Sequence, residues 1–211
     1  KSNEIATKIG ENSAKCLKYI KILCDLGIVY KETPFGEKEA SRKTIYGISD
    51  LMFRFWYRYV FPNRTLIETG AIEAVWEKKV SPDYSNYMGL VFEKICRDYL
   101  SSENAKGNLP FLFTAIGRWW GTNSSTHSQE EIDIVANSAD DYLIGECKWR
   151  NEKTDMSVLS GLKRKADVFN KNRGDTWFVL FSKSGFTNEL VSKAAKDNRI
   201  ILVDTDKLIK A

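Results

Sequence analysis

Two short acidic segments in the C-terminal half of the chain carry residue types suited to metal-dependent chemistry. The first reads EEIDIVA, the second reads YLIGECKW, and five residues separate them. In an extended strand alternate side chains share one face, so Glu131 and Asp133 lie together, as do Glu146 and Lys148. The positions between them are apolar, which predicts a sheet with charge on one face only.

A hairpin would bring these two segments together. With a four-residue loop at 138–141, Asn137 pairs with Tyr142, and this register sets Asp133 opposite Glu146. The Cβ atoms of directly opposed residues lie roughly 4.5–5.5 Å apart. Two carboxylates and the ammonium group of the nearby lysine are therefore expected to converge.

Two adjacent carboxylates repel each other unless a proton or a cation joins them, and a hard divalent ion with oxygen ligands is the simplest solution. The pattern therefore indicates Mg²⁺ or Mn²⁺. Such an ion activates a bound water and stabilises charge on a phosphodiester, while Lys148 orients the water or compensates the developing charge. The alternative is a surface hairpin in which Lys148 makes ordinary cross-strand pairs with Glu131 and Glu146, and the spacing alone does not decide between them.

These strands belong to a longer alternation of helices and strands. The expected order is helix, three strands, helix, strand, helix, strand, which is typical of an α/β fold. The expected ranges are 84–101, 111–118, 131–136, 142–149, 156–169, 176–182, 188–195 and 200–204. Neither GxxxxGKS nor GxxxxGKT occurs in the sequence, so the chain has no phosphate-binding P-loop and is not a complete P-loop ATPase.

The first fifty residues follow the order helix, turn, helix, β hairpin. Asn3 is expected to cap a first helix that stops at Gly10, and a second helix runs from an Asn12 or Ser13 cap to Asp25. The hairpin strands are expected at 28–30 and 43–48. This order is typical of a winged helix-turn-helix domain.

The excess positive charge of the chain is concentrated in the same region. Residues 1–60 contain 11 Lys and Arg against 7 Asp and Glu, whereas the remaining residues contain 21 of each. A basic face on the second helix and on the hairpin would contact DNA phosphates. A structural connector or protein-docking module is the alternative, because winged helices serve both purposes. The candidate DNA contacts are Lys15, Lys18, Lys21 and Lys43.

Residues 51–82 form a connector that is rich in aromatic side chains. Six aromatic residues occur within the eleven residues LMFRFWYRYVF, with Arg54 and Arg58 four positions apart. We expect these rings to be mostly buried and to pack one domain on the other, because they cover more than one helical face. Stacking of nucleic-acid bases on the rings is the alternative.

The D-x₁₂-E-x-K spacing of Asp133, Glu146 and Lys148, in this order of elements, resembles the PD-(D/E)XK nuclease superfamily of restriction and repair endonucleases. From about residue 4 to its end, the chain is also similar to the C-terminal region of archaeal-type DEXX-box AAA+ ATPases. In that family a winged helix follows the ATPase module and precedes segments like FRFWYRYVFPNR, GLVFEKICRDYL, IGRWW, EIDIVA and ECKW. The resemblance implies a restriction-endonuclease-like αβββαβ domain at residues 83–211.

The resemblance also implies roles for individual residues. Asp133 and Glu146 are similar to the metal-binding acids, and Lys148 to the catalytic lysine. Glu93 matches an acid that these nucleases often place on their first helix beside the metal, and a solvated helix glutamate is the alternative. Glu131 is an additional candidate acid. Two features depart from the family pattern, because isoleucine precedes Asp133 and the Gln-x-x-x-Tyr helix motif of many relatives reads SGLKRKADVF here.

The rest of the sequence bounds the cellular context. No apolar run reaches the roughly 18 residues of a membrane span, and the first residues are too polar for a signal peptide. Four cysteines without a CxxC pair indicate a reducing cytoplasm. The lone His127 is expected to be incidental, and the basic run 163–165 to be a solvated face or a DNA-backbone contact. Because the chain begins at Lys1 without a methionine, we interpret it as part of a longer protein.

Together these observations predict the C-terminal portion of a DEXX-box ATPase that binds DNA and is a candidate for Mg²⁺- or Mn²⁺-dependent cleavage. ATP would act only through a module outside this chain, which would also be a partner. One alternative is a nucleic-acid-binding module without hydrolysis. Another is a protein-interaction or oligomerisation region that serves the ATPase module.

Overall fold

The structure is a computed structural model, and it describes residues 1–39, 41–169 and 174–210. The chain divides into two compact units, of which the first comprises Lys1–Tyr84 and the second begins at Ser85. Each unit has its own apolar core.

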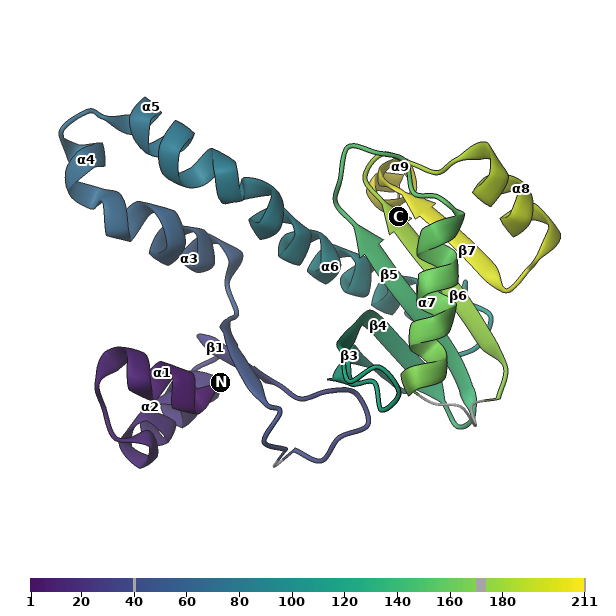
Figure 1. Ribbon diagram of the computed structural model, residues 1–211, viewed down its shortest axis with the longest axis horizontal. Coiled ribbons are helices and arrows are strands. Elements are labelled where there is room, and N and C mark those ends of the chain that lie inside the picture. The colour runs from purple at the N-terminus through teal and green to yellow at the C-terminus, as the bar shows by residue number, and fades with distance from the viewer. Residues whose placement is uncertain (40, 170–173, 211) are drawn as a thin grey trace. The chain divides into compact units, whose positions relative to one another are not determined.

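The first unit opens with two helices joined by a tight turn (Figure 1). Helix α1 (Ser2–Ile9) ends at Gly10, whose φ of 69° is in the left-handed region that glycine adopts without a Cβ clash. Helix α2 (Ser13–Asp25) is capped by the side chain of Asn12. The predicted helix, turn and helix are therefore confirmed, but Asn3 lies inside α1 and is not its cap.

A two-stranded antiparallel hairpin follows the helices. Strand β1 (Val29–Glu32) pairs with β2 (Ile45–Ile48). A small apolar cluster of Ala6, Cys16 and Ile20 holds the two helices together, and Tyr46 of the hairpin packs against it. Burial of this apolar cluster stabilises the two helices and the hairpin as one structural element.

The aromatic connector is helical but, contrary to the expectation, mostly exposed. Within the described segment 51–63, Tyr59 is the only buried residue, whereas Met52, Tyr57 and Phe61 are 67%, 56% and 56% exposed. The physical reason is that the segment packs against a single antiparallel arm, so only one of its faces is covered (Figure 1). The elements are α3 (Leu51–Phe55), η1 (Trp56–Val60), η2 (Phe61–Asn63), α4 (Arg64–Glu68), α5 (Ile72–Val75) and η3 (Trp76–Val80).

Polar contacts join the two arms of this helical hairpin. The Tyr59 hydroxyl donates a hydrogen bond to the Asp83 carboxylate at 2.7 Å, and Arg58 Nε donates to the same oxygen at 2.7 Å. Asp83 lies near the start of the long helix α6 (Ser81–Lys106). These bonds fix how the first arm packs on the second.

The second unit is an α/β fold around one five-stranded sheet, as predicted. The strand order is β3-β4-β5-β6-β7, with antiparallel pairing among the first three strands and parallel pairing among the last three. After α6 the elements are β3 (Ala115–Thr122), β4 (Gln129–Ser138), β5 (Asp141–Lys148), α7 (Met156–Phe169), β6 (Thr176–Ser182), α8 (Asn188–Lys196), β7 (Ile200–Asp204) and α9 (Thr205–Lys210).

Helices cover both faces of the sheet, and this determines which side chains of β4 and β5 are buried together. On one face, α6 contributes Phe92, Cys96 and Leu100 to a core with Ile134 and Val179. On the opposite face lies α7, which packs on β4, β5 and β6 (Figure 1). Its buried stripe consists of Leu159, Leu162 and Ala166.

The hairpin between β4 and β5 has the predicted register but a shorter turn. Asn137 pairs with Tyr142 as expected, and the ladder also includes a Ser138–Asp141 pair. The turn therefore consists of two residues instead of four, and Ala139 has a positive φ of 47°. The ladder ends at the Ile134–Gly145 pair. Asp133 and Glu146 were expected to form the next pair, but the Asp133 side chain contacts the backbone of β5 instead.

Candidate active site

Asp133 is the centre of the candidate site. It lies on β4, is only 7% exposed, and its Oδ2 accepts a hydrogen bond from the backbone N–H of Cys147 at 2.8 Å. This bond continues the connection between β4 and β5 beyond the end of the ladder. Burial, together with the negative charges of Glu146 and Glu93, raises the pKa of Asp133 from 3.8 to about 7.

Glu146 lies on the neighbouring strand β5 and is 5% exposed. Lys148, two residues later, donates a hydrogen bond to Oε1 at 2.6 Å. Lys165 reaches the same carboxylate from α7, and its Nζ lies 3.0 Å from Oε1 and 2.9 Å from Oε2. Glu146 is therefore a buried carboxylate that is ion-paired with two ammonium groups.

Glu146 and Asp133 hold Lys148 in its charged form. Burial disfavours the ammonium ion, but the charge of Glu146 and the hydrogen bond to it outweigh burial, so the pKa of Lys148 is raised above its usual value. At neutral pH this side chain is a cation and a hydrogen-bond donor, and it is not a base.

Glu93, on α6, belongs to the same electrostatic cluster. Its side chain is 16% exposed, and its Oε2 lies 3.4 Å from Nε of Arg118 on β3 and 3.9 Å from Nη1 of Arg97. It is thus an ion-paired residue and differs from the solvated helix glutamate that was the alternative. Glu131, 65% exposed at its side chain, lies 3.7 Å from the same arginine of β3 and forms the outer edge of the cluster.

The structure thus brings Asp133, Glu146 and Lys148 together, and the charge of Glu93 acts on Asp133. The donor atoms are carboxylate oxygens, which are the ligands that Mg²⁺ and Mn²⁺ prefer, and the negative charge that raises the pKa of Asp133 is what a cation would relieve. The chemistry of these residues therefore fits a hard divalent ion. Among the described residues, no three His, Cys, Asp or Glu side chains are already grouped as a metal site, and the three-acid set stays a prediction.

Lys165 is the residue that sequence reasoning missed, because the basic run 163–165 was interpreted as a solvated face or a contact with the DNA backbone. Arg164 forms a two-pronged ion pair with Glu130, with Nη2 3.1 Å from Oε2. Lys163 Nζ lies over the ring of Phe178. The available signal was helical spacing, since Lys165 follows the buried Leu162 by three residues and so lies at the border of the buried stripe.

The predicted DNA contacts of the first unit lie on its surface. Lys15, Lys18, Lys21 and Lys43 are all exposed. Two of them are ion-paired, since Lys15 lies 2.8 Å from Glu11 and Lys43 lies 2.6 Å from Glu37. Exposed ion pairs are weak, so they leave these ammonium groups available to phosphates. DNA binding by these four lysines stays a prediction.

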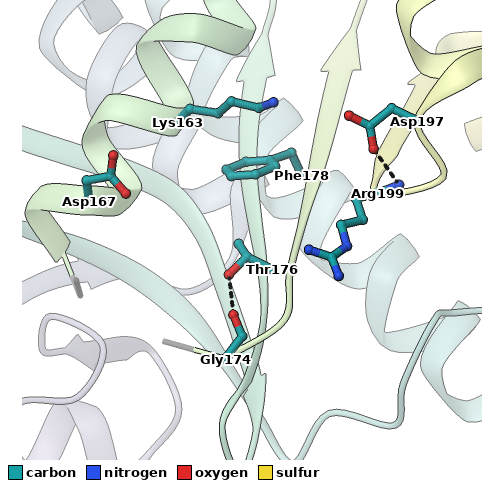
Figure 2. A pocket seen from close by; sticks show the side chains of 7 residues that line it. All are labelled: Lys163, Asp167, Gly174, Thr176, Phe178, Asp197 and Arg199. Atoms are coloured by element: carbon teal, nitrogen blue, oxygen red, sulfur yellow. Dashed lines mark hydrogen bonds between the residues drawn. The ribbon is translucent and has the colours of Figure 1, made fainter. Parts of the chain in front are cut away.

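A pocket of about 500 Å³ lies apart from the acidic cluster, between α7, β6 and the turn that precedes β7 (Figure 2). Lys163 extends above the Phe178 ring, and the guanidinium of Arg199 lies on the other side of it. Two cations are balanced by two carboxylates in the lining, so its charge favours neither an anionic nor a cationic ligand. The lining residues are Lys163, Asp167, Gly174, Thr176, Phe178, Asp197 and Arg199.

In the part of the chain that the structure describes, the helices are all too short or too polar to cross a membrane.

Comparison with known proteins finds sequence similarity to a family whose function is not defined. Residues 56–159 match the model of the DUF234 family, described as archaeal and bacterial proteins of unknown function. Over 184 residues the chain is 31% identical to an uncharacterized protein of Methanocaldococcus jannaschii, covering 85% of this chain and 40% of that protein. The chain thus spans less than half the length of this relative.

A search of solved structures finds the crystal structure of a protein of unknown function, with 16% sequence identity and a TM-score of 0.35. The similarity covers 55% of this chain and 65% of that chain. The segment 56–159, which matches the DUF234 model, contains Glu93, Asp133, Glu146 and Lys148. By sequence, the chain is therefore similar to archaeal and bacterial proteins of unknown function.

Proposed function

We propose that the second unit binds nucleic acid at the Asp133–Glu146–Lys148 cluster and hydrolyses phosphodiester bonds with Mg²⁺ or Mn²⁺. The observation that carries the proposal is Asp133, a buried carboxyl whose pKa is raised to about 7 by burial and by two neighbouring acids. A buried carboxyl group whose ionised form destabilises the folded protein is typical of a functional site.

Asp133 and Glu146 are the residues that would hold the ion, and Glu93 is the third candidate ligand. When bound, a divalent ion supplies an activated water and stabilises charge on the phosphate. The hydrogen bond from the Cys147 backbone fixes the orientation of Asp133. Because the pKa of Lys148 is raised, its ammonium group serves as a donor that orients a water or compensates negative charge, and not as the base.

The basic residues of the first unit would supply binding that does not depend on sequence. Lys15, Lys18, Lys21 and Lys43 are exposed and suit contacts with phosphates, which position a nucleic acid without reading its bases. In a DEXX-box ATPase, this unit would hold DNA while the ATPase module, outside this chain, uses ATP. This coupling is part of the proposal and follows from the resemblance in sequence.

The experiment is cleavage of supercoiled plasmid and branched DNA with Mg²⁺, Mn²⁺ or EDTA. Asp133→Asn and Lys148→Met are compared with Glu152→Gln, which alters an exposed acid outside the cluster. We expect cleavage by the unaltered protein and by Glu152→Gln, and loss in the first two variants. Binding of the same DNA, followed by fluorescence anisotropy, distinguishes a non-catalytic binding module, which would retain affinity without cleavage under any condition.

A second candidate function, protein interaction, is favoured by the exposed aromatic connector. Monomeric soluble proteins rarely expose large contiguous apolar patches. Phe53, Trp56, Tyr57 and Phe61 are each at least 43% exposed within ten residues of chain. If this surface mediates self-association, Tyr57→Ser combined with Phe61→Ser shifts the mass measured by analytical ultracentrifugation toward the monomer. An unchanged mass contradicts a role for this surface in self-association.

A further inference from the structure

Lys165 contacts Glu146 differently from Lys148. Lys148 donates to one oxygen of the carboxylate, whereas Nζ of Lys165 lies within 3.0 Å of both oxygens. The Lys165 side chain is 19% exposed and that of Glu146 is 7% exposed, so the pair is shielded from water. Lys165 thus contacts both oxygens of the carboxylate that would hold the ion.

An ammonium group and a divalent ion cannot both bind these two oxygens. Both need the same carboxylate lone pairs, and two cations within about 3 Å of each other repel strongly in a shielded site. The two partners also come from different layers of the fold, since Glu146 lies on β5 and Lys165 on α7. A four-carbon stem lets the lysine leave the carboxylate by rotating its side chain, without a change in either backbone.

We propose that Lys165 is a displaceable counter-ion for Glu146, which neutralises this carboxylate in the metal-free protein and leaves it when a divalent ion binds. The inference rests on the proposed metal site. It explains how two neighbouring acids remain buried without metal, and it makes ion binding a competition. After displacement, the ammonium group of Lys165 remains near the site because its side chain is anchored on α7. There it compensates the charge of a bound phosphate.

The test measures metal affinity and stability in the same variants. Mn²⁺ binding is followed by isothermal titration calorimetry, and thermal unfolding is recorded in EDTA and in Mn²⁺. Lys165→Met removes the charge but keeps a side chain of similar length. Lys163→Met is the matched control, because Lys163 lies on the same helix but its Nζ faces the Phe178 ring of β6, 5.3 Å from the ring centroid.

Lys165→Met is expected to bind Mn²⁺ at least about tenfold more tightly, because the ion no longer displaces a cation from a shielded carboxylate. In EDTA the same variant is expected to unfold at a lower temperature, because Glu146 has lost a partner. The two effects thus have opposite signs, whereas a purely structural role would lower stability without tightening metal binding. Lys163→Met and Lys165→Arg are expected to retain the affinity of the unaltered protein.

Unchanged or weaker Mn²⁺ binding by Lys165→Met, in a protein that binds Mn²⁺ through Asp133 and Glu146, overturns the proposal and leaves the metal site standing. If Asp133→Asn and Glu146→Gln bind Mn²⁺ as the unaltered protein does, or none of the proteins binds it, the metal site itself is wrong. The inference about Lys165 then falls with it. Lys165→Gln, which keeps a hydrogen-bond donor, provides the same comparison if Lys165→Met does not fold.

Discussion

Replacing Asp133 by asparagine is expected to stabilise the metal-free protein at pH 8. The pKa of Asp133 is about 7 in the folded protein, against an ordinary value of 3.8, because of burial and the charges of Glu146 and Glu93. A pKa raised on folding means that the folded state favours the protonated acid. This contribution is fully present below pH 4 and is lost as the pH rises through 7.

The magnitude follows from the shift. About three pKa units, at about 1.4 kcal/mol each, correspond to roughly 4 kcal/mol of stability lost between pH 4 and pH 8. Asparagine carries no charge and its oxygen can still accept the backbone hydrogen bond of Cys147. Its amide adds a donor that needs a partner, so the expected net gain for Asp133→Asn at pH 8 is about 2–4 kcal/mol.

The assay is urea unfolding in EDTA from pH 4 to pH 8, with the free energy of unfolding extrapolated to zero urea. Asp133→Asn is expected to show a much flatter pH dependence than the unaltered protein. The control is Asp140→Asn, which changes an exposed acid in the turn of the same hairpin. A variant that is less stable than the unaltered protein at pH 8, or that keeps the full pH dependence, would refute the reasoning.

Three further predictions concern the surroundings of the site and a hydrogen bond within the first unit. Glu93→Gln removes a negative charge that raises the pKa of Asp133, so the pH midpoint of the stability loss, measured by the same unfolding series, is expected to shift to lower pH. An unmoved midpoint would contradict this coupling. Gly145→Ala places a Cβ 2.9 Å from side-chain carbons of Ile134 and Val179, and is expected to cost about 1–3 kcal/mol in urea unfolding; no loss would show that the core adapts. Tyr59→Phe removes a hydrogen bond to an aspartate in the first unit, with an expected loss of about 1–2 kcal/mol there, and an unchanged unfolding curve would argue against that bond.

Much of the fold follows from local signals in the sequence. Gly10 and Asn12 predicted where the first two helices end and begin, because a left-handed residue and a capping side chain are needed at those positions. Alternating polar and apolar residues predicted β4 and β5, and the pairing of Asn137 with Tyr142 is the one observed. These features depend on neighbours in the chain, so a single sequence contains them.

Other features depend on contacts between distant segments, and the sequence did not predict them. The acids were expected to face each other across the ladder, but the ladder ends at Ile134–Gly145 and the Asp133 side chain binds a backbone N–H instead. The pairing of Lys165 with Glu146 depends on how α7 packs on the sheet. The aromatic connector was expected to be buried because its rings cover more than one helical face, but one packing partner covers only one of those faces.

The central claim is that Asp133 and Glu146 form a site for metal-dependent hydrolysis of phosphodiester bonds. The most direct test is the rate of plasmid nicking in Mn²⁺, measured for the unaltered protein, Asp133→Asn and the Glu152→Gln control at equal concentration. We predict nicking by the unaltered protein and the control that EDTA abolishes, with at least a roughly hundredfold loss in Asp133→Asn. Nicking that persists undiminished in Asp133→Asn, or its absence in the unaltered protein with each metal and DNA substrate, would contradict the claim.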